Sequence, residues 1–190
     1  QSQWPRCILG SRRIGAATAL EDSCQHPEAV AGLVLVIPPT AWETRPRQAA
    51  IYRRLAWVSG LFGAAPYRLL DLLPIPVRED GRSRLALHTA RGLAMANPLQ
   101  VQAALRGAAR SDLPSAEQLA DLQVPTLILT WIDDTAHPVA TAETLADHLP
   151  DVRGLVVCDP ADISAWLPAI LEFTAATSEA ERKTARKRAR

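Results

Sequence analysis

The chain lacks the cysteine pattern and the long apolar run that mark many secreted or membrane-spanning proteins. Its 190 residues include three cysteines, Cys7, Cys24 and Cys158, and no two of them form a C-x-x-C pair. An odd number of scattered cysteines argues against a disulfide framework or a thiolate zinc site, and favours the reducing cytoplasm. The longest apolar run, residues 31–39, is too short to cross a bilayer. No basic stretch followed by an apolar one opens the chain, so we expect no signal peptide.

Signature motifs for cofactors and metals are missing as well. The sequence contains no G-x-G-x-x-G, Walker A or H-E-x-x-H pattern, so we expect no cofactor and no metal. A formal net charge of +1 gives no global field that would attract nucleic acid or a membrane. The basic residues within positions 182–190 have no aromatic neighbours, which favours a solvated tail over a phosphate-binding one. A small molecule is therefore the expected partner, and the oligomeric state stays open.

What the sequence does contain is an alternation of apolar runs with helical patterns. Residues 33–37 are five consecutive apolar residues, three of them β-branched, which predicts a strand covered on both faces. Residues 125–130 and 154–158 predict two further strands, and Cys7-Ile8-Leu9 predicts the end of a short buried one. Since helical patterns lie between these runs, we expect an α/β fold with a mostly parallel sheet.

Residues 40–120 interrupt this alternation with helical spacing, frequent prolines and no strand candidate. We therefore expect four segments. These are a partial α/β core at 1–39, an all-helical insertion at 40–120, a second part of the core at 121–173 and a frayed or disordered basic tail at 174–190. Three or four strands are few for such a sheet and would leave an edge unpaired, so we expect that the first half of the domain is absent.

Three local patterns have counterparts in one known family. Small residues after Gly15, followed by His26-Pro27-Glu28-Ala29-Val30, look like an elbow helix and the strand after it. The stretch Trp131-Ile132-Asp133-Asp134-Thr135-Ala136-His137-Pro138 looks like a loop that carries a triad acid, and the helical insertion looks like a cap. From about Ile8 to Phe173 the chain thus resembles the C-terminal part of the α/β-hydrolase family. Residues 37–45 are further similar to bacterial members labelled enol-lactone hydrolases.

The nucleophile elbow departs from the family's G-x-S-x-G pattern. The strained strand-to-helix turn needs small residues two before and two after the nucleophile. Anchored on Gly15, the apex is Arg13, and its protonated guanidinium cannot attack a carbonyl. In the other register Ser11 is the nucleophile, but Leu9 and Arg13 would then crowd the turn. We favour Arg13 as the apex and keep Ser11 as the alternative, with the backbone N–H of Ile14 as one oxyanion donor.

The triad acid has a candidate and the triad base has a poor one. The resemblance assigns the acid to Asp134, and the alternative is a solvated loop aspartate beside Asp133. The family histidine follows the last strand, whereas residues 159–166 contain none. His137 on the acid loop is the remaining candidate base, although a lone histidine is more often a loop or capping residue.

Three interpretations of function stay open. By lineage the chain is a hydrolase of small esters, lactones or amides, inactive as it stands because the nucleophile and the histidine are missing. Alternatively it is a non-catalytic relative that binds a small apolar ligand or a protein partner. A third interpretation is a damaged copy, with an upstream frameshift or a misplaced start. Whether the chain is an enzyme is therefore undecided from its sequence.

Overall fold

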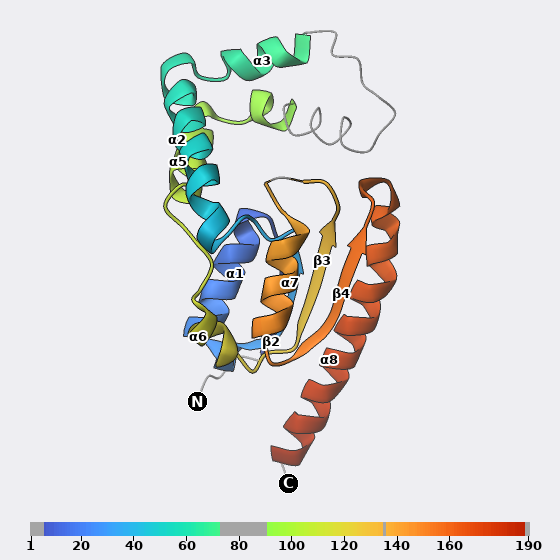
Figure 1. Ribbon diagram of the computed structural model, residues 1–190. Coiled ribbons are helices and arrows are strands. Elements are labelled where there is room, and N and C mark those ends of the chain that lie inside the picture. Colours follow the sequence, from blue (N-terminus) through green and yellow to red (C-terminus); the bar gives the residue numbers. More distant parts are fainter. Residues whose placement is uncertain (1–5, 73–90, 135, 189–190) are drawn as a thin grey trace. The chain divides into compact units, whose positions relative to one another are not determined.

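The computed structural model describes residues 6–72, 91–134 and 136–188, which divide into two compact units (Figure 1). Unit 1 comprises Gln1–Ala41 and Leu113–Arg190, and unit 2 is the continuous segment Trp42–Asp112. The short helix α6 (Ala116–Ala120), which lies within the helical insertion expected at 40–120, belongs to unit 1. Residues 73–90 of that insertion lie outside the described residues, as do residues 1–5 and 189–190.

Unit 1 is built on a parallel sheet in which sequence order and spatial order coincide, β1-β2-β3-β4. The strands are β1 (Cys7–Arg12), β2 (Val30–Val36), β3 (Thr126–Trp131) and β4 (Val152–Cys158). Helix α1 (Ile14–Gln25) and a 3₁₀ turn (Pro27–Ala29) connect β1 to β2, and α7 (Val139–His148) connects β3 to β4. The α/β class with a parallel sheet is confirmed.

The two central strands form the core of unit 1. Every residue of β3 is buried and β2 is buried up to its last residue, as expected of strands covered on both faces. The strand predicted at residues 7–9 is confirmed, but its expected end at Leu9 and its burial are wrong. Strand β1 continues to Arg12, each of its residues is exposed or partly buried, and within the described residues it pairs with β2.

Helices cover both faces of the sheet. Helices α1 and α7 lie on one face, and α8 (Trp166–Arg188) lies on the other (Figure 1). A Cβ added to Gly32 in β2 would come within 3.1 Å of both Phe173 and Thr177 of α8, so this helix packs directly on the sheet. The absence of a side chain at position 32 sets how closely α8 approaches.

Helix α8 also corrects the expectation of a disordered tail from residue 174. The helix continues through Arg188, and Thr177 is buried against the sheet. Asp159 caps the 3₁₀ segment (Pro160–Ala165) that precedes the helix, by accepting the N–H of Ala161 at 2.8 Å. The sequence did not predict the second half of this helix because its apolar pattern is weak. A helix that buries one face and exposes the others to solvent needs few apolar residues.

Unit 2 contains helices α2 (Arg45–Phe62), α3 (Ala65–Leu72) and α5 (Pro98–Ala108), with a 3₁₀ turn at Trp42–Thr44. The side chain of Arg45 is buried and donates to the backbone carbonyls of Ala108 and Ser111, which ties the start of the unit to its end. Within the described residues, no helix of either unit combines the length and apolarity needed to span a membrane.

Candidate active site

The turn between β1 and α1 consists of Arg13 alone. Strand β1 ends at Arg12 and α1 begins at Ile14, so Arg13 reverses the chain with φ 55° and ψ −127°. This is a backbone conformation that residues with a Cβ rarely adopt, and it persists only where surrounding contacts hold it. The N–H of Arg13 donates to the carbonyl of Val36, and its carbonyl accepts the N–H of Ala16, both at 3.0 Å. The apex of a strained strand–turn–helix elbow is therefore an arginine.

Ser11 lies beneath this turn rather than at its apex. It is part of β1, and a Cβ added to Gly15 would come within 2.3 Å of the Ser11 Oγ. The backbone of Gly15 thus passes directly over the Ser11 side chain. This is the close approach that the elbow pattern requires of small residues on both sides of the apex. The geometry favours a role for Ser11 in the turn, and its use as a nucleophile stays a prediction.

The acid loop after β3 brings two of the candidate residues together. Asp134 Oδ2 accepts hydrogen bonds from His137 Nδ1 at 2.8 Å and from Trp131 Nε1 at 3.1 Å. Asp134 Oδ1 accepts the backbone N–H of Ala136 at 2.9 Å. The side chain of His137 is only 7% exposed, so the pair forms a largely buried carboxylate–imidazole dyad.

Opposing effects act on the Asp134 carboxyl group. Burial raises its pKa, but the hydrogen bond and the charge of His137, together with the donors on Trp131 and Ala136, outweigh burial. The pKa of Asp134 therefore lies well below the usual carboxyl range. A carboxylate that stays ionised and accepts the Nδ1 proton of an imidazole fixes the orientation of the ring.

Strained residues gather at the carboxyl ends of the strands. Arg13 follows β1, Ile37 follows β2 with φ 45°, and Asp133 follows β3 with φ 66°. The loops after β2 and β3 are also joined, since the N–H of Thr40 donates to the carbonyl of Ala136 at 3.0 Å. Ligands of parallel α/β sheets bind at this edge, and positive φ in non-glycine residues is typical of functional sites.

The elbow and the acid loop are separate groups on this edge. They follow β1 and β3, and β2 lies between those strands. Parallel strands lie about 4.8 Å apart, which puts the two turns roughly 10 Å from each other. The backbone N–H of Ile14, the predicted oxyanion donor, belongs to the first turn of α1 beside Arg13.

An aromatic pair occupies the region after β4, where the resemblance implies a histidine. Trp166 stacks on Trp131 with ring centroids 5.5 Å apart, and both indoles are buried. Trp131 in turn donates to Asp134. The position of Trp131 as the last residue of β3, three before the acid, is the signal that could have identified its role.

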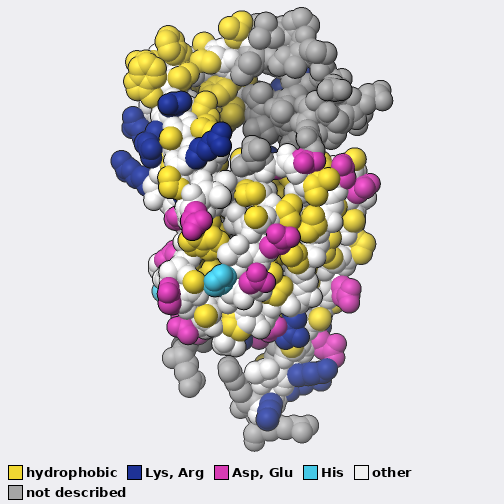
Figure 2. Space-filling model, in the orientation of Figure 1, with side chains coloured by type: hydrophobic (Ala, Val, Ile, Leu, Met, Phe, Trp, Pro, Cys, Tyr) yellow, Lys and Arg dark blue, Asp and Glu magenta, His cyan; other side chains and the backbone are white. Residues whose placement is uncertain are grey.

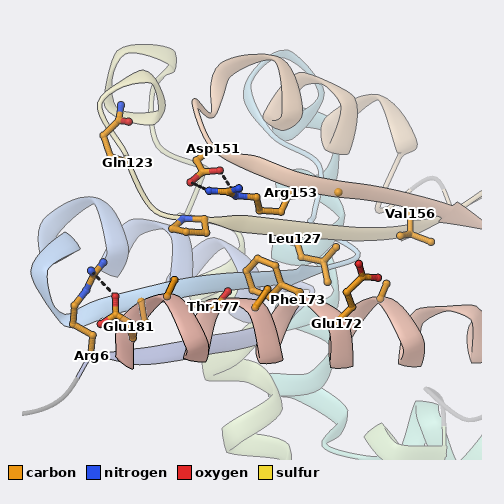
Figure 3. A pocket seen from close by; sticks show the side chains of 16 residues that line it. Arg6, Gln123, Leu127, Asp151, Arg153, Val156, Glu172, Phe173, Thr177 and Glu181 are labelled. Carbon is orange, nitrogen blue, oxygen red and sulfur yellow. Dashed lines mark hydrogen bonds and ion pairs between the residues drawn. The ribbon is translucent and has the colours of Figure 1, made fainter. Parts of the chain in front are cut away.

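A cavity of about 590 Å³ in unit 1 lies away from this site (Figure 3). It opens between α8 and the amino ends of β3 and β4, where Pro125, Asp151 and Arg153 line it. None of the candidate residues borders it. Because α/β sheets bind ligands at the opposite edge, its size alone does not make it the active site. Among the described residues, no three His, Cys, Asp or Glu side chains come together as metal ligands.

Comparisons with solved structures identify the fold. A thermophilic esterase from Thermogutta terrifontis matches with a TM-score of 0.63 and 23% identity over 91% of this chain and 66% of that one. MGS-M2, an alpha/beta hydrolase from a Medee basin deep-sea metagenome library, matches with a TM-score of 0.66 and 16% identity over 90% and 65%. Carboxylesterases of the thaumarchaeon Nitrososphaera gargenis match with a TM-score of 0.69 and 13% identity over 92% and 66%. The chain has the α/β-hydrolase fold.

The sequence comparison agrees with this α/β-hydrolase assignment. The chain is 29% identical over 155 residues to the pimeloyl-[acyl-carrier protein] methyl ester esterase of Aromatoleum aromaticum. The matched region covers 74% of this chain and 60% of that protein. The chain thus spans about three-fifths of the length of this curated relative. No family model matches the chain. The relatives named here are hydrolases and esterases.

Proposed function

We propose that this chain descends from hydrolases of small esters, lactones or amides and does not carry out acyl transfer as it stands. The observation that carries the proposal is Arg13 at the apex of the elbow. A guanidinium stays protonated at any working pH and offers no electron pair to a carbonyl carbon. The unit 2 helices are, on this proposal, the cap of the lineage.

The acid loop supports descent from a catalytic ancestor. Asp134 and His137 form a buried dyad at 2.8 Å, as a general base and its orienting carboxylate would. Here the imidazole comes from the acid's own loop rather than from the region after β4. We propose that the dyad is the remnant of the acid–base machinery, with His137 as its base.

Replacement of the apex residue tests this proposal. A fluorophosphonate probe labels an activated serine, and p-nitrophenyl acetate reports turnover. We expect the 190-residue chain to give neither signal, and Arg13→Ser to gain covalent labelling that Arg13→Ser/His137→Ala loses. Labelling of the unaltered chain that Ser11→Ala abolishes would contradict the proposal and make Ser11 the nucleophile.

A second candidate function is binding without turnover. The Nε atom of Arg13 is buried and has no hydrogen-bond partner within the described structure. A buried donor without a partner costs free energy that a bound acceptor would recover. We therefore propose, as the alternative, a binding protein for a small apolar molecule with a carboxylate group.

Isothermal titration with short-chain carboxylates and their methyl esters examines the binding alternative. We expect saturable binding of a carboxylate, weaker binding of its ester and loss of binding in Arg13→Gln. Equal binding of both forms, or no heat with any member of the panel, would contradict it. Arg12→Gln, at the exposed neighbouring position, is the matched control.

A further inference from the structure

Charge is distributed unequally between the two units. Residues Trp42–Asp112 hold eleven of the chain's 21 Lys and Arg residues but only five of its 20 Asp and Glu residues. Unit 2 therefore carries a net positive charge, and the rest of the chain a net negative one. The expectation that no membrane is a partner relied on the net charge of the whole chain, in which these two contributions cancel.

Unit 2 also exposes large apolar side chains at one end, which we call the apolar tip. It consists of Trp57, Leu61 and Phe62 in the last two turns of α2 and Leu69 in α3, and these side chains are 57–64% exposed. Figure 2 shows the apolar side chains gathered over this end of α2 and α3. Scattered exposed leucines are ordinary, but a cluster that includes Trp and Phe marks an interaction surface.

Two residues of the tip, from different helices, share one surface groove. Phe62 and Leu69 line the same open groove together with Arg68 and Pro98. Leu99, the next residue after Pro98, is 75% exposed. The C-terminal end of α2, the start of α5 and one side of α3 therefore present a shared apolar end with an arginine at its rim.

Two exposed arginines of α2 precede the tip by about one helical turn. Arg53 and Arg54 are exposed one turn before Trp57 on α2, and Figure 2 shows basic side chains next to the apolar cluster. At 1.5 Å per helical residue, Arg54 lies about 12 Å along the axis from Phe62. Amphipathic segments bury their apolar residues roughly 5–10 Å into the boundary between headgroups and acyl chains. Guanidinium groups at that separation reach the level of the lipid phosphates when the tip is inserted.

We propose that the apolar tip of unit 2 inserts into the surface of a bilayer that contains anionic phospholipid. Trp57 and Phe62 enter the interfacial layer, where amphipathic and aromatic rings are favoured. Arg53, Arg54 and Arg68 contact the phosphates. The binding is peripheral and reversible, and it requires no membrane-spanning helix. It is independent of whether the site in unit 1 turns over a substrate.

Vesicle co-sedimentation of the 190-residue chain tests this proposal. We expect the chain to bind vesicles of phosphatidylglycerol and phosphatidylcholine, and to bind phosphatidylcholine alone roughly tenfold or more weakly, since each arginine near an anionic surface contributes about 1 kcal/mol. Added salt should weaken the first interaction. Equal binding to both kinds of vesicle, or binding to neither, would overturn the proposal.

Three variants assign the binding to the tip. Trp57→Ser/Leu61→Ser/Phe62→Ser should lose binding to the mixed vesicles, and Arg53→Gln/Arg54→Gln should lower it roughly thirtyfold. The control Leu167→Ser/Leu171→Ser removes two leucines of α8 that are each 59% exposed, and it should bind as the parent does. Far-UV circular dichroism verifies that each variant is folded. If the triple variant does not fold, the arginine variant still tests the proposal, because it alters only surface charge.

Other occupants of the tip would give different results. A second copy of the chain would make the parent dimeric in sedimentation equilibrium and the tip variant monomeric, with neither on vesicles. An acidic protein surface would be mimicked by soluble polyglutamate, which would bind the parent while vesicles would not. Either result, or a tip variant that still sediments with the vesicles, overturns the proposal.

Discussion

Arg13 forms the turn between β1 and α1, although its side chain cannot act as a nucleophile. The elbow depends on the close approach of the Ser11 side chain to the backbone of Gly15, and on the hydrogen bonds that hold Arg13 on both sides. None of these contacts needs a serine at the apex. A strain of about 1–3 kcal/mol, typical of such a position, is therefore compatible with an apex side chain that cannot attack a carbonyl.

Asp134 gives a residue-scale prediction about pH. Because its pKa in the folded state is held below the usual range, folding favours the ionised carboxylate. That stabilisation is fully present above about pH 4, where an unfolded aspartate is ionised, and it is lost as the pH falls below that range. We expect Asp134→Asn to be less stable than the parent by about 1–3 kcal/mol at pH 7, with the difference shrinking toward pH 3.

Urea denaturation between pH 7 and pH 3 measures this difference. Asp121→Asn, which alters an exposed aspartate outside the acid loop, serves as the control and should follow the parent at every pH. A gap between Asp134→Asn and the parent that stays constant over the whole range would show that the dyad does not favour the ionised form.

At the scale of elements, apolar runs predicted the central strands and failed at the periphery. Residues 33–37 and 125–130 are mostly apolar because β2 and β3 are covered on both faces. A continuous apolar run therefore indicates that a strand is central in the sheet. No residue of strand β1 is fully buried, and the second half of α8 buries one side only, so the apolar pattern of both segments is weak. The location of Asp134 just after a strand could be predicted from the sequence. Its pairing with His137 could not, because it depends on loop geometry that no spacing rule encodes.

The packing of α8 on β2 gives an element-scale prediction. A methyl group at Gly32 would lie 3.1 Å from side-chain atoms of both Phe173 and Thr177. We expect Gly32→Ala to lower the free energy of unfolding by roughly 1–3 kcal/mol, because α8 must shift or its side chains must leave their rotamers. Phe173→Leu in the same chain should recover part of this loss by removing the crowding ring edge.

Equilibrium urea unfolding of the single and double variants measures the coupling between the two sites. Gly10→Ala is the matched control, because Gly10 also lies in a strand but has open space where its Cβ would be. It should change stability by about 0.5 kcal/mol or less. Strictly additive effects of Gly32→Ala and Phe173→Leu would mean that α8 does not rest on β2 at this point.

At the scale of the whole molecule, the chain combines two units that differ in sequence continuity. Unit 1 is assembled from segments on either side of Trp42–Asp112, whereas unit 2 is one continuous stretch. The ends of unit 2 are tied to each other, since the N–H of Trp42 donates to Asp112 Oδ1 at 3.0 Å and Arg45 donates to Ser111. Because its two ends are hydrogen-bonded to each other, we expect unit 2 to unfold locally without unfolding of the sheet in unit 1.

Arg45 provides the test of that independence. Its buried guanidinium donates to the carbonyls of Ala108 and Ser111 and to the Ser111 hydroxyl, so Arg45→Ala leaves buried acceptors without their donors. We expect a cost of roughly 1–3 kcal/mol that falls on unit 2 alone. Hydrogen exchange should show faster exchange of the α2 and α5 amides and unchanged protection of β2 and β3, with the exposed Arg47→Ala as the control. If β2 and β3 lost protection to the same extent, the two units would unfold as a single cooperative structure, and the binding of unit 2 to a surface would then be coupled to the stability of the sheet.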